Sequence, residues 1–138
     1  IDLLKKIDNS INFKINNKTG KKVIINFDNE QFNRLFFNLI KNSIESINEK
    51  AQKTNKLLKN IDIEINQRRD YITVNLTDTG VGFKDIKTKD IIKPYYTTKK
   101  KGTGLGLSIV DKIINDHNGS IKFFNSNNGA KVQIIIPK

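Results

Sequence analysis

The sequence predicts an α+β two-layer domain in which helices pack on one face of a mixed, mostly antiparallel sheet. Three observations favour this class: segments that alternate apolar and polar residues, segments with helical spacing of apolar residues, and an order that mixes the two along the chain. The 138 residues, 36% of them apolar, suit one hydrophobic core. We therefore expect residues 1–138 to form one domain.

Alternation of apolar and polar residues predicts six strands, at residues 11–15, 23–27, 61–65, 72–76, 120–125 and 130–137. The first two are expected to pair as a β-hairpin through a turn at 16–22. The last two are joined by a turn that is rich in Asn and Gly.

Helical spacing occurs twice. From Phe32 to Ala51, apolar residues recur at steps of three and four, which predicts a long helix at about 30–53, with Asp28 or Asn29 as its cap. Leu35 and Leu39 widen its apolar stripe. A second helix is predicted at about 105–117, ending at the Asn-Gly pair 118–119.

The composition excludes several classes of protein. Without cysteine, the chain has neither a disulfide framework nor a cysteine-rich zinc site. No apolar run approaches the roughly 18 residues of a membrane span, so we expect no insertion of this chain into a membrane. The chain starts at Ile1 and has no methionine, which favours a piece of a longer protein.

The net charge of +11 raises the question of a nucleic-acid partner. The excess is lysine, with arginine only at positions 34, 68 and 69, in a chain rich in Asn and Ile. This pattern indicates a compositional bias and a solvated surface, and we expect no nucleic-acid partner.

The first chemical motif is a pair of asparagines, Asn38 and Asn42, four residues apart on one face of the long helix, with Glu45 continuing that face. Asparagine is a mediocre helix former, so the pair needs a reason. Its amide oxygens suit Mg²⁺, which prefers oxygen ligands and bridges to phosphates. The alternative is a solvent-facing polar stripe.

The second motif is residues 78–82, Asp-Thr-Gly-Val-Gly. Counting by twos along the strand 72–76 places the Asp78 carboxylate on the buried side of the sheet, where it requires a hydrogen-bond donor. An adenine amino group is such a donor, and Gly80 and Gly82 let backbone approach a flat ring. Alternatively, Asp78 caps the Thr-Gly turn.

The third motif, residues 102–107, is Gly-Thr-Gly-Leu-Gly-Leu at the start of the second helix. Glycines before a helix leave N–H groups free at the positive end of its dipole, which favours a phosphate site. A flexible hinge is the alternative. The motif follows a loop at 83–103 that holds seven lysines and that we expect to form a lid over the nucleotide.

Taken in this order, the motifs resemble those of the Bergerat-fold ATPases, a superfamily of gyrase-type topoisomerases, ninety-kilodalton heat-shock chaperones, mismatch-repair ATPases and histidine kinases. Residues 38–43 resemble the N box of histidine kinases, and residues 78–82 and 102–107 resemble their two glycine boxes. The similarity extends to a lid segment at 93–99, Lys-Pro-Tyr-Tyr-Thr-Thr-Lys, and to the helix at 109–119. Glu45 stands where many of these kinases have a basic residue, and the nitrogen-regulation sensors are the most similar group.

The resemblance implies the Bergerat fold, with ATP and Mg²⁺ as ligands and Asn42 as the magnesium ligand. It also implies a set of nucleotide-binding residues: Asn38, Asn42, Asp78, Gly80, Gly82, Lys99, Gly102, Thr103, Gly104, Leu105 and Gly106. Such a domain transfers the γ-phosphate of ATP to a histidine on a separate dimerisation domain of the same protein, which then serves a response regulator. We therefore expect a cytoplasmic domain of a membrane-anchored bacterial sensor.

Two rival enzymes share this fold. In its hydrolases a glutamate occupies the position of Asn38, whose amide cannot act as a general base. Stand-alone serine kinases of the anti-sigma type have about this length, but the missing methionine start and the lid segment 93–99 argue against them. A nucleotide-sensing module without catalysis is a further alternative.

His117 is the only histidine. It follows Ile113 by four residues on the apolar stripe of the second helix, so we expect it to pack or to cap the helix. The phospho-accepting histidine of the family lies in an upstream helix.

Overall fold

The computed structural model describes residues 9–54, 58–83, 106–126 and 128–138. Along the chain, the described elements are β1 (Asn12–Asn17), α2 (Asn29–Ala51), β2 (Asn60–Gln67), β3 (Tyr71–Asp78), α4 (Gly106–Asp116), β4 (Ser120–Ser126) and β5 (Gly129–Pro137).

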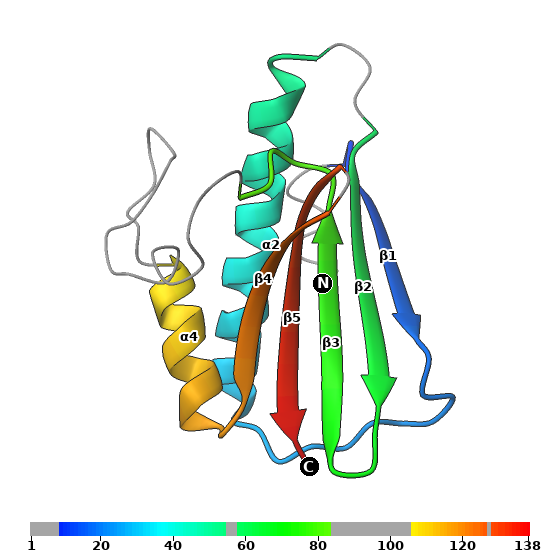
Figure 1. The fold of residues 1–138 in the computed structure, drawn as a ribbon, viewed down its shortest axis with the longest axis vertical. Helices are drawn as coiled ribbons and strands as arrows, with labels where there is room; N and C mark the ends of the chain where they lie inside the picture. The colour runs from blue at the N-terminus through cyan, green and yellow to red at the C-terminus, as the bar shows by residue number, and fades with distance from the viewer. Residues whose placement is uncertain (1–8, 55–57, 84–105, 127) are drawn as a thin grey trace.

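The strands form one sheet in the order β1-β2-β3-β5-β4 (Figure 1). Among the described strands, only the pair β1 and β2 is parallel, and the other three pairs are antiparallel. The predicted class, an α+β two-layer arrangement with a mixed, mostly antiparallel sheet, is confirmed. In the described ranges, no helix is long and apolar enough to cross a membrane.

Both helices pack on the same face of the sheet, because their buried residues belong to one cluster with the inward-facing residues of the strands. On α2 the buried face is centred on Leu35 and Leu39, whereas Phe32 is 37% exposed. As predicted, Asp28 caps this helix: its Oδ1 accepts a hydrogen bond of 2.9 Å from the Gln31 N–H. Figure 1 shows α4 starting beside the middle of α2 and running antiparallel to it.

The predicted hairpin of 11–15 and 23–27 is wrong. β1 pairs in parallel with β2, and residues 22–28 form no strand. The apolar residues of that segment are instead packed against the core by side chains alone, as Val23, Ile25 and Phe27 show, while Ile24 is 79% exposed. Alternation identifies a segment with one buried side, but it does not identify a hydrogen-bonding partner.

The end of α4 depends on the Asn-Gly pair, as predicted, but the two residues have different roles. Asn118 adopts the left-handed conformation, with φ of 58°, and the Gly119 N–H donates to the Ile114 carbonyl at 2.9 Å. Gly119 is required by close packing, because a Cβ there would lie 2.6 Å from the Ile135 carbonyl oxygen.

His117 ties the end of α4 to the start of α2. Its Nε2 accepts a hydrogen bond of 3.2 Å from the Asp28 N–H, so the imidazole carries its proton on Nδ1, which lies 2.7 Å from the Ile113 carbonyl. The ring stacks on Phe27 with centroids 3.6 Å apart. The structure therefore gives His117 the packing and capping role that the sequence predicted.

We predict that His117→Ala lowers the free energy of unfolding by about 2 kcal/mol, because it removes the ring stack and leaves the Asp28 N–H without its partner. Urea denaturation measures this change. Asn115→Ala, on the exposed side of the same helix, is the control and should stay within about 0.5 kcal/mol of wild type. If the two substitutions lowered the free energy of unfolding equally, the proposed link between the end of α4 and the start of α2 would be contradicted.

Candidate functional site

The paired asparagines of α2 meet the first residue of α4. A Cβ placed on Gly106 would lie 3.5 Å from Asn38 Oδ1 and 3.6 Å from Asn42 Nδ2. The Asn38 amide nitrogen donates to the Arg34 carbonyl at 2.8 Å, which fixes the side chain. The structure therefore brings the first sequence motif together with Gly106 of the third at the N-terminal end of α4, where backbone N–H groups lack helical partners.

The groups that meet at the start of α4 suit Mg²⁺ together with a phosphate group. Among the described residues, no group of three or more His, Cys, Asp or Glu side chains could hold a metal ion. Mg²⁺ needs few protein ligands when it keeps waters and binds phosphate oxygens, and an amide oxygen such as that of Asn42 is a suitable one.

Asp78 lies at the end of β3 with only 4% of its surface exposed, on the buried side that the alternation predicted. Its Oδ1 accepts hydrogen bonds from the Gly80 N–H at 2.9 Å and from the Ala130 N–H at 3.3 Å. Burial raises the pKa of the carboxyl above its ordinary value, and the hydrogen bonds from Gly80, Ser43 and Ala130 and the charge of Lys50 oppose that shift. The protein thus supplies three donors to this carboxyl group, and a carboxylate has further lone pairs that can accept a hydrogen bond from a bound ligand.

The loop after β3 packs directly on α2. A Cβ on Gly80 would overlap the Ser46 side chain, whose Oγ accepts a hydrogen bond of 2.9 Å from the Val81 N–H. Gly82 has φ of 74°, a conformation that favours glycine. Both glycines are therefore required for the path of the loop itself, in addition to any approach to a ligand.

Sequence reasoning missed the groups that hold this loop from the other side. The side-chain oxygen of Asn125, on β4, accepts a hydrogen bond of 2.7 Å from the Phe83 N–H. Gly129 has no room for a Cβ, which would overlap the Asp78 carbonyl. Nothing local marks these residues, since they act through contacts with residues more than 40 positions away.

Several predicted site residues lie outside the described residues: Lys99, Gly102, Thr103, Gly104 and Leu105. The predicted lid at 83–103 also falls outside them, except for Phe83. Gly106 is thus the described glycine of the third motif.

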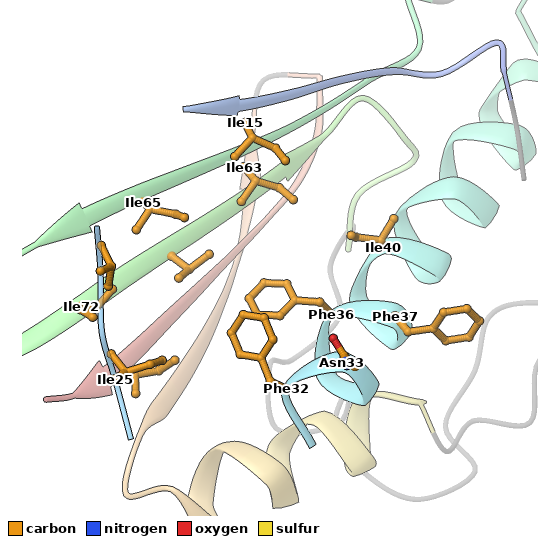
Figure 2. Close-up of a pocket in the computed structure, with 13 residues that line it drawn as sticks. Ile15, Ile25, Phe32, Asn33, Phe36, Phe37, Ile40, Ile63, Ile65 and Ile72 are labelled. Atoms are coloured by element: carbon orange, nitrogen blue, oxygen red, sulfur yellow. The ribbon is translucent and has the colours of Figure 1, made fainter. Parts of the chain in front are cut away.

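An apolar cavity of about 570 Å³ lies between the N-terminal half of α2, the sheet and the segment before α2 (Figure 2). Phe32 and Phe36 point into it from α2, whereas the side chain of Phe37 is directed away. Among the described residues that line it, Asn33 is the one polar residue, and no described residue of the predicted site lines it. The described lining offers no charged group to a triphosphate, and the candidate site lies farther along α2.

The family described as histidine kinase-, DNA gyrase B- and HSP90-like ATPases matches residues 27–138. The chain is 34% identical over 115 residues to sporulation kinase C of Bacillus subtilis, covering 83% of this chain and 25% of that protein. It is 32% identical over 105 residues to a putative NtrY-like sensor histidine kinase of Rickettsia bellii, covering 76% and 16%. The chain therefore spans about a quarter of the first relative and less of the second.

Solved structures agree with these relatives. The nucleotide-free catalytic domain of the histidine kinase ThkA superposes with a TM-score of 0.80 at 28% identity, covering 99% of this chain and 85% of that one. The mycobacterial sensor histidine kinase MprB gives a TM-score of 0.79 at 18% identity over 99% and 87% of the two chains, which shows the shared fold alone. The chain thus belongs to the family of histidine kinase-, DNA gyrase B- and HSP90-like ATPases, and its relatives there include sensor histidine kinases.

Proposed function

We propose that this chain binds Mg-ATP and transfers its γ-phosphate to a histidine on a separate dimerisation domain of the same protein. It would then be the ATP-binding domain of a protein-histidine kinase in a two-component system, with a response regulator downstream. The parent would be a membrane-anchored bacterial sensor with this domain on its cytoplasmic side.

The observation that carries the proposal is that α2 contacts one described glycine of each glycine motif. One part of the helix presents Asn38 and Asn42 to Gly106, at the start of α4. About one turn farther along, Ser46 contacts Gly80 in the loop that follows Asp78. The residues that suit phosphate and metal and the loop that follows Asp78 thus contact the same helix about one turn apart, which supports one nucleotide that spans both.

Each part of the nucleotide is assigned to its own residues. Asp78 accepts a hydrogen bond from the exocyclic amino group of adenine, Asn42 holds Mg²⁺, and Lys99 contacts phosphate. The proposed nucleotide-binding set is Asn38, Asn42, Asp78, Gly80, Gly82, Lys99, Gly102, Thr103, Gly104, Leu105 and Gly106.

Phosphoryl transfer is favoured over hydrolysis by the residue one turn before Asn42. Asn38 is an amide that cannot take a proton from water, and its nitrogen already donates to the Arg34 carbonyl. Transfer requires mainly positioning and neutralisation of charge, which Mg²⁺ and backbone N–H groups supply. The nucleophile would come from the dimerisation domain.

We predict that Asp78→Asn weakens ATP binding at least about tenfold, because a hydrogen bond to a charged acceptor is replaced by one to an amide that also presents a donor to the adenine amino group. Isothermal titration calorimetry in the presence of Mg²⁺ measures the affinity. Asp62→Asn, an exposed carboxylate on β2, should bind ATP as wild type does. Unchanged affinity of a folded Asp78→Asn variant would remove Asp78 from the site.

The Asp78→Asn variant should gain stability relative to wild type as the pH rises from about 4 to 7. Burial raises the folded-state pKa of Asp78, so the stability contributed by its protonated form is lost as the pH rises through that pKa. The asparagine stays neutral, and its oxygen can accept from Gly80 and Ala130. Thermal unfolding midpoints at the two pH values test this, and a constant difference would contradict it.

Asn42→Ala should reduce ATP affinity by about tenfold in Mg²⁺ and by much less in excess EDTA, because the lost amide oxygen serves the metal. Titrations under the two conditions separate these effects. Asn33→Ala, at an exposed position of the same helix, is the matched control. A loss of the same size in EDTA would show that Asn42 does not act through Mg²⁺.

Incubation of this chain with γ-labelled ATP should leave it unlabelled, because both ring nitrogens of His117 are hydrogen bonded to backbone groups. Addition of the parent's histidine-bearing segment should produce an acid-labile label on that segment. The Asn42→Ala chain should give much less label. Acid-labile label on His117 would contradict the proposed division of roles.

A further inference from the structure

Lys50, in the last turn of α2, reaches the turn between β4 and β5. Its ammonium group donates a hydrogen bond of 2.8 Å to the Asn128 carbonyl, across 78 positions of sequence. Lys50 is partly buried, and it belongs to none of the sequence motifs.

The turn that Lys50 holds packs directly on Asp78. Next to Asn128, Gly129 lies so close that an added Cβ would overlap the Asp78 carbonyl and lie 2.8 Å from the Gly80 nitrogen. The following N–H, of Ala130, donates to Asp78 Oδ1 at 3.3 Å. A displacement of the turn would therefore move a hydrogen-bond donor away from the carboxylate.

The charge of Lys50 acts on the same carboxyl group. Burial raises the pKa of Asp78, and the hydrogen bonds from Gly80, Ser43 and Ala130 lower it, as does the positive charge of Lys50. Lys50 thus favours the ionised carboxylate in two ways: by its own charge and by holding the Ala130 donor in place.

We propose that Lys50 is a positioning residue for adenine recognition, which holds the β4–β5 turn against Asp78 and thereby fixes the carboxylate that selects the base. The proposal rests on the function proposed above, in which Asp78 accepts from the adenine amino group. Lys50 itself touches no substrate in this arrangement.

Two other roles are open to a lysine at this place: attraction of the triphosphate, and a structural tie without effect on binding. Comparison of ATP with ITP separates them. The two nucleotides share ribose and triphosphate, but hypoxanthine has a carbonyl oxygen where adenine has the amino group. An effect that passes through Asp78 lowers the affinity for ATP without an equal loss for ITP, whereas attraction of phosphate lowers both affinities equally.

The experiment compares Lys50→Met, Lys50→Arg and Lys53→Met with wild type by calorimetry in Mg²⁺. We expect Lys50→Met to weaken ATP binding by about five- to tenfold without an equal loss of ITP binding, since a charge-assisted hydrogen bond and a nearby charge are lost. Lys50→Arg, which keeps charge and donors, should retain the ATP preference. Lys53→Met removes the same charge at an exposed position and should have no effect.

A second readout is the pH titration of the Asp78 side-chain carboxyl carbon by NMR in the free protein. Its midpoint should rise in Lys50→Met and stay unchanged in Lys50→Arg and Lys53→Met. If the hydrogen bond of Lys50 only stabilised the fold, Lys50→Met would lower the unfolding temperature without changing the ratio of the affinities for ATP and ITP. That result would overturn the proposal.

An equal fall in the affinities for ATP and ITP would also overturn it, because Lys50 would then act on phosphate. A third outcome is that wild type prefers ATP, that Asp78→Asn loses this preference, and that Lys50→Met keeps it. In that case the role proposed for Lys50 is wrong, while the proposed function stands. If wild type does not distinguish ATP from ITP, the adenine contact of Asp78 fails first, and the role of Lys50 fails with it.

Discussion

The structure around the candidate site depends on the burial of one carboxylate. Asp78 ends β3, the central strand of the sheet, with 4% of its surface exposed. Taking a carboxylate out of water is costly unless donors replace the lost hydration. The donors come from three directions: Gly80 in the following loop, Ala130 at the start of β5, and Ser43 on α2. The hydrogen bonds that the buried Asp78 carboxylate requires therefore fix the relative positions of a loop, a strand and a helix.

Helix α2 is the common support of these parts. Its buried face joins the core, while Asn38, Asn42 and Ser46, each four residues from the next, follow one line along its surface. The two amides meet the start of α4, and the serine meets the loop after Asp78. A helix of 23 residues is long enough to present both groups and still fill the core with residues such as Leu35 and Leu39. The geometry of the candidate site is thus set by the same helix that stabilises the fold.

Features with a local cause could be predicted from the sequence. The buried position of Asp78 follows from counting by twos along β3, the Asp28 cap from its place before a helical stripe, and the end of α4 from the Asn-Gly pair. Features that depend on distant partners could not. The parallel pairing of β1 with β2 joins residues 48 positions apart, from Asn12 opposite Asn60, and alternation contains no information about the partner strand. Lys50 and Asn125 were missed for the same reason, since each acts on a turn or loop far away in the sequence.

The proposed function places the phospho-accepting histidine outside this ATP-binding domain, and the hydrogen bonds of His117 agree with that placement. A histidine that accepts a phosphoryl group must offer a free nitrogen lone pair. In His117 the lone pair of Nε2 accepts from the Asp28 N–H, Nδ1 carries the proton and faces the Ile113 carbonyl, and the ring is stacked on Phe27. Freeing Nε2 would break the link between the end of α4 and the start of α2, the two helices that flank the candidate site. The role of this histidine in positioning those helices is therefore incompatible with that of a nucleophile, and the proposed transfer needs an acceptor histidine from another domain.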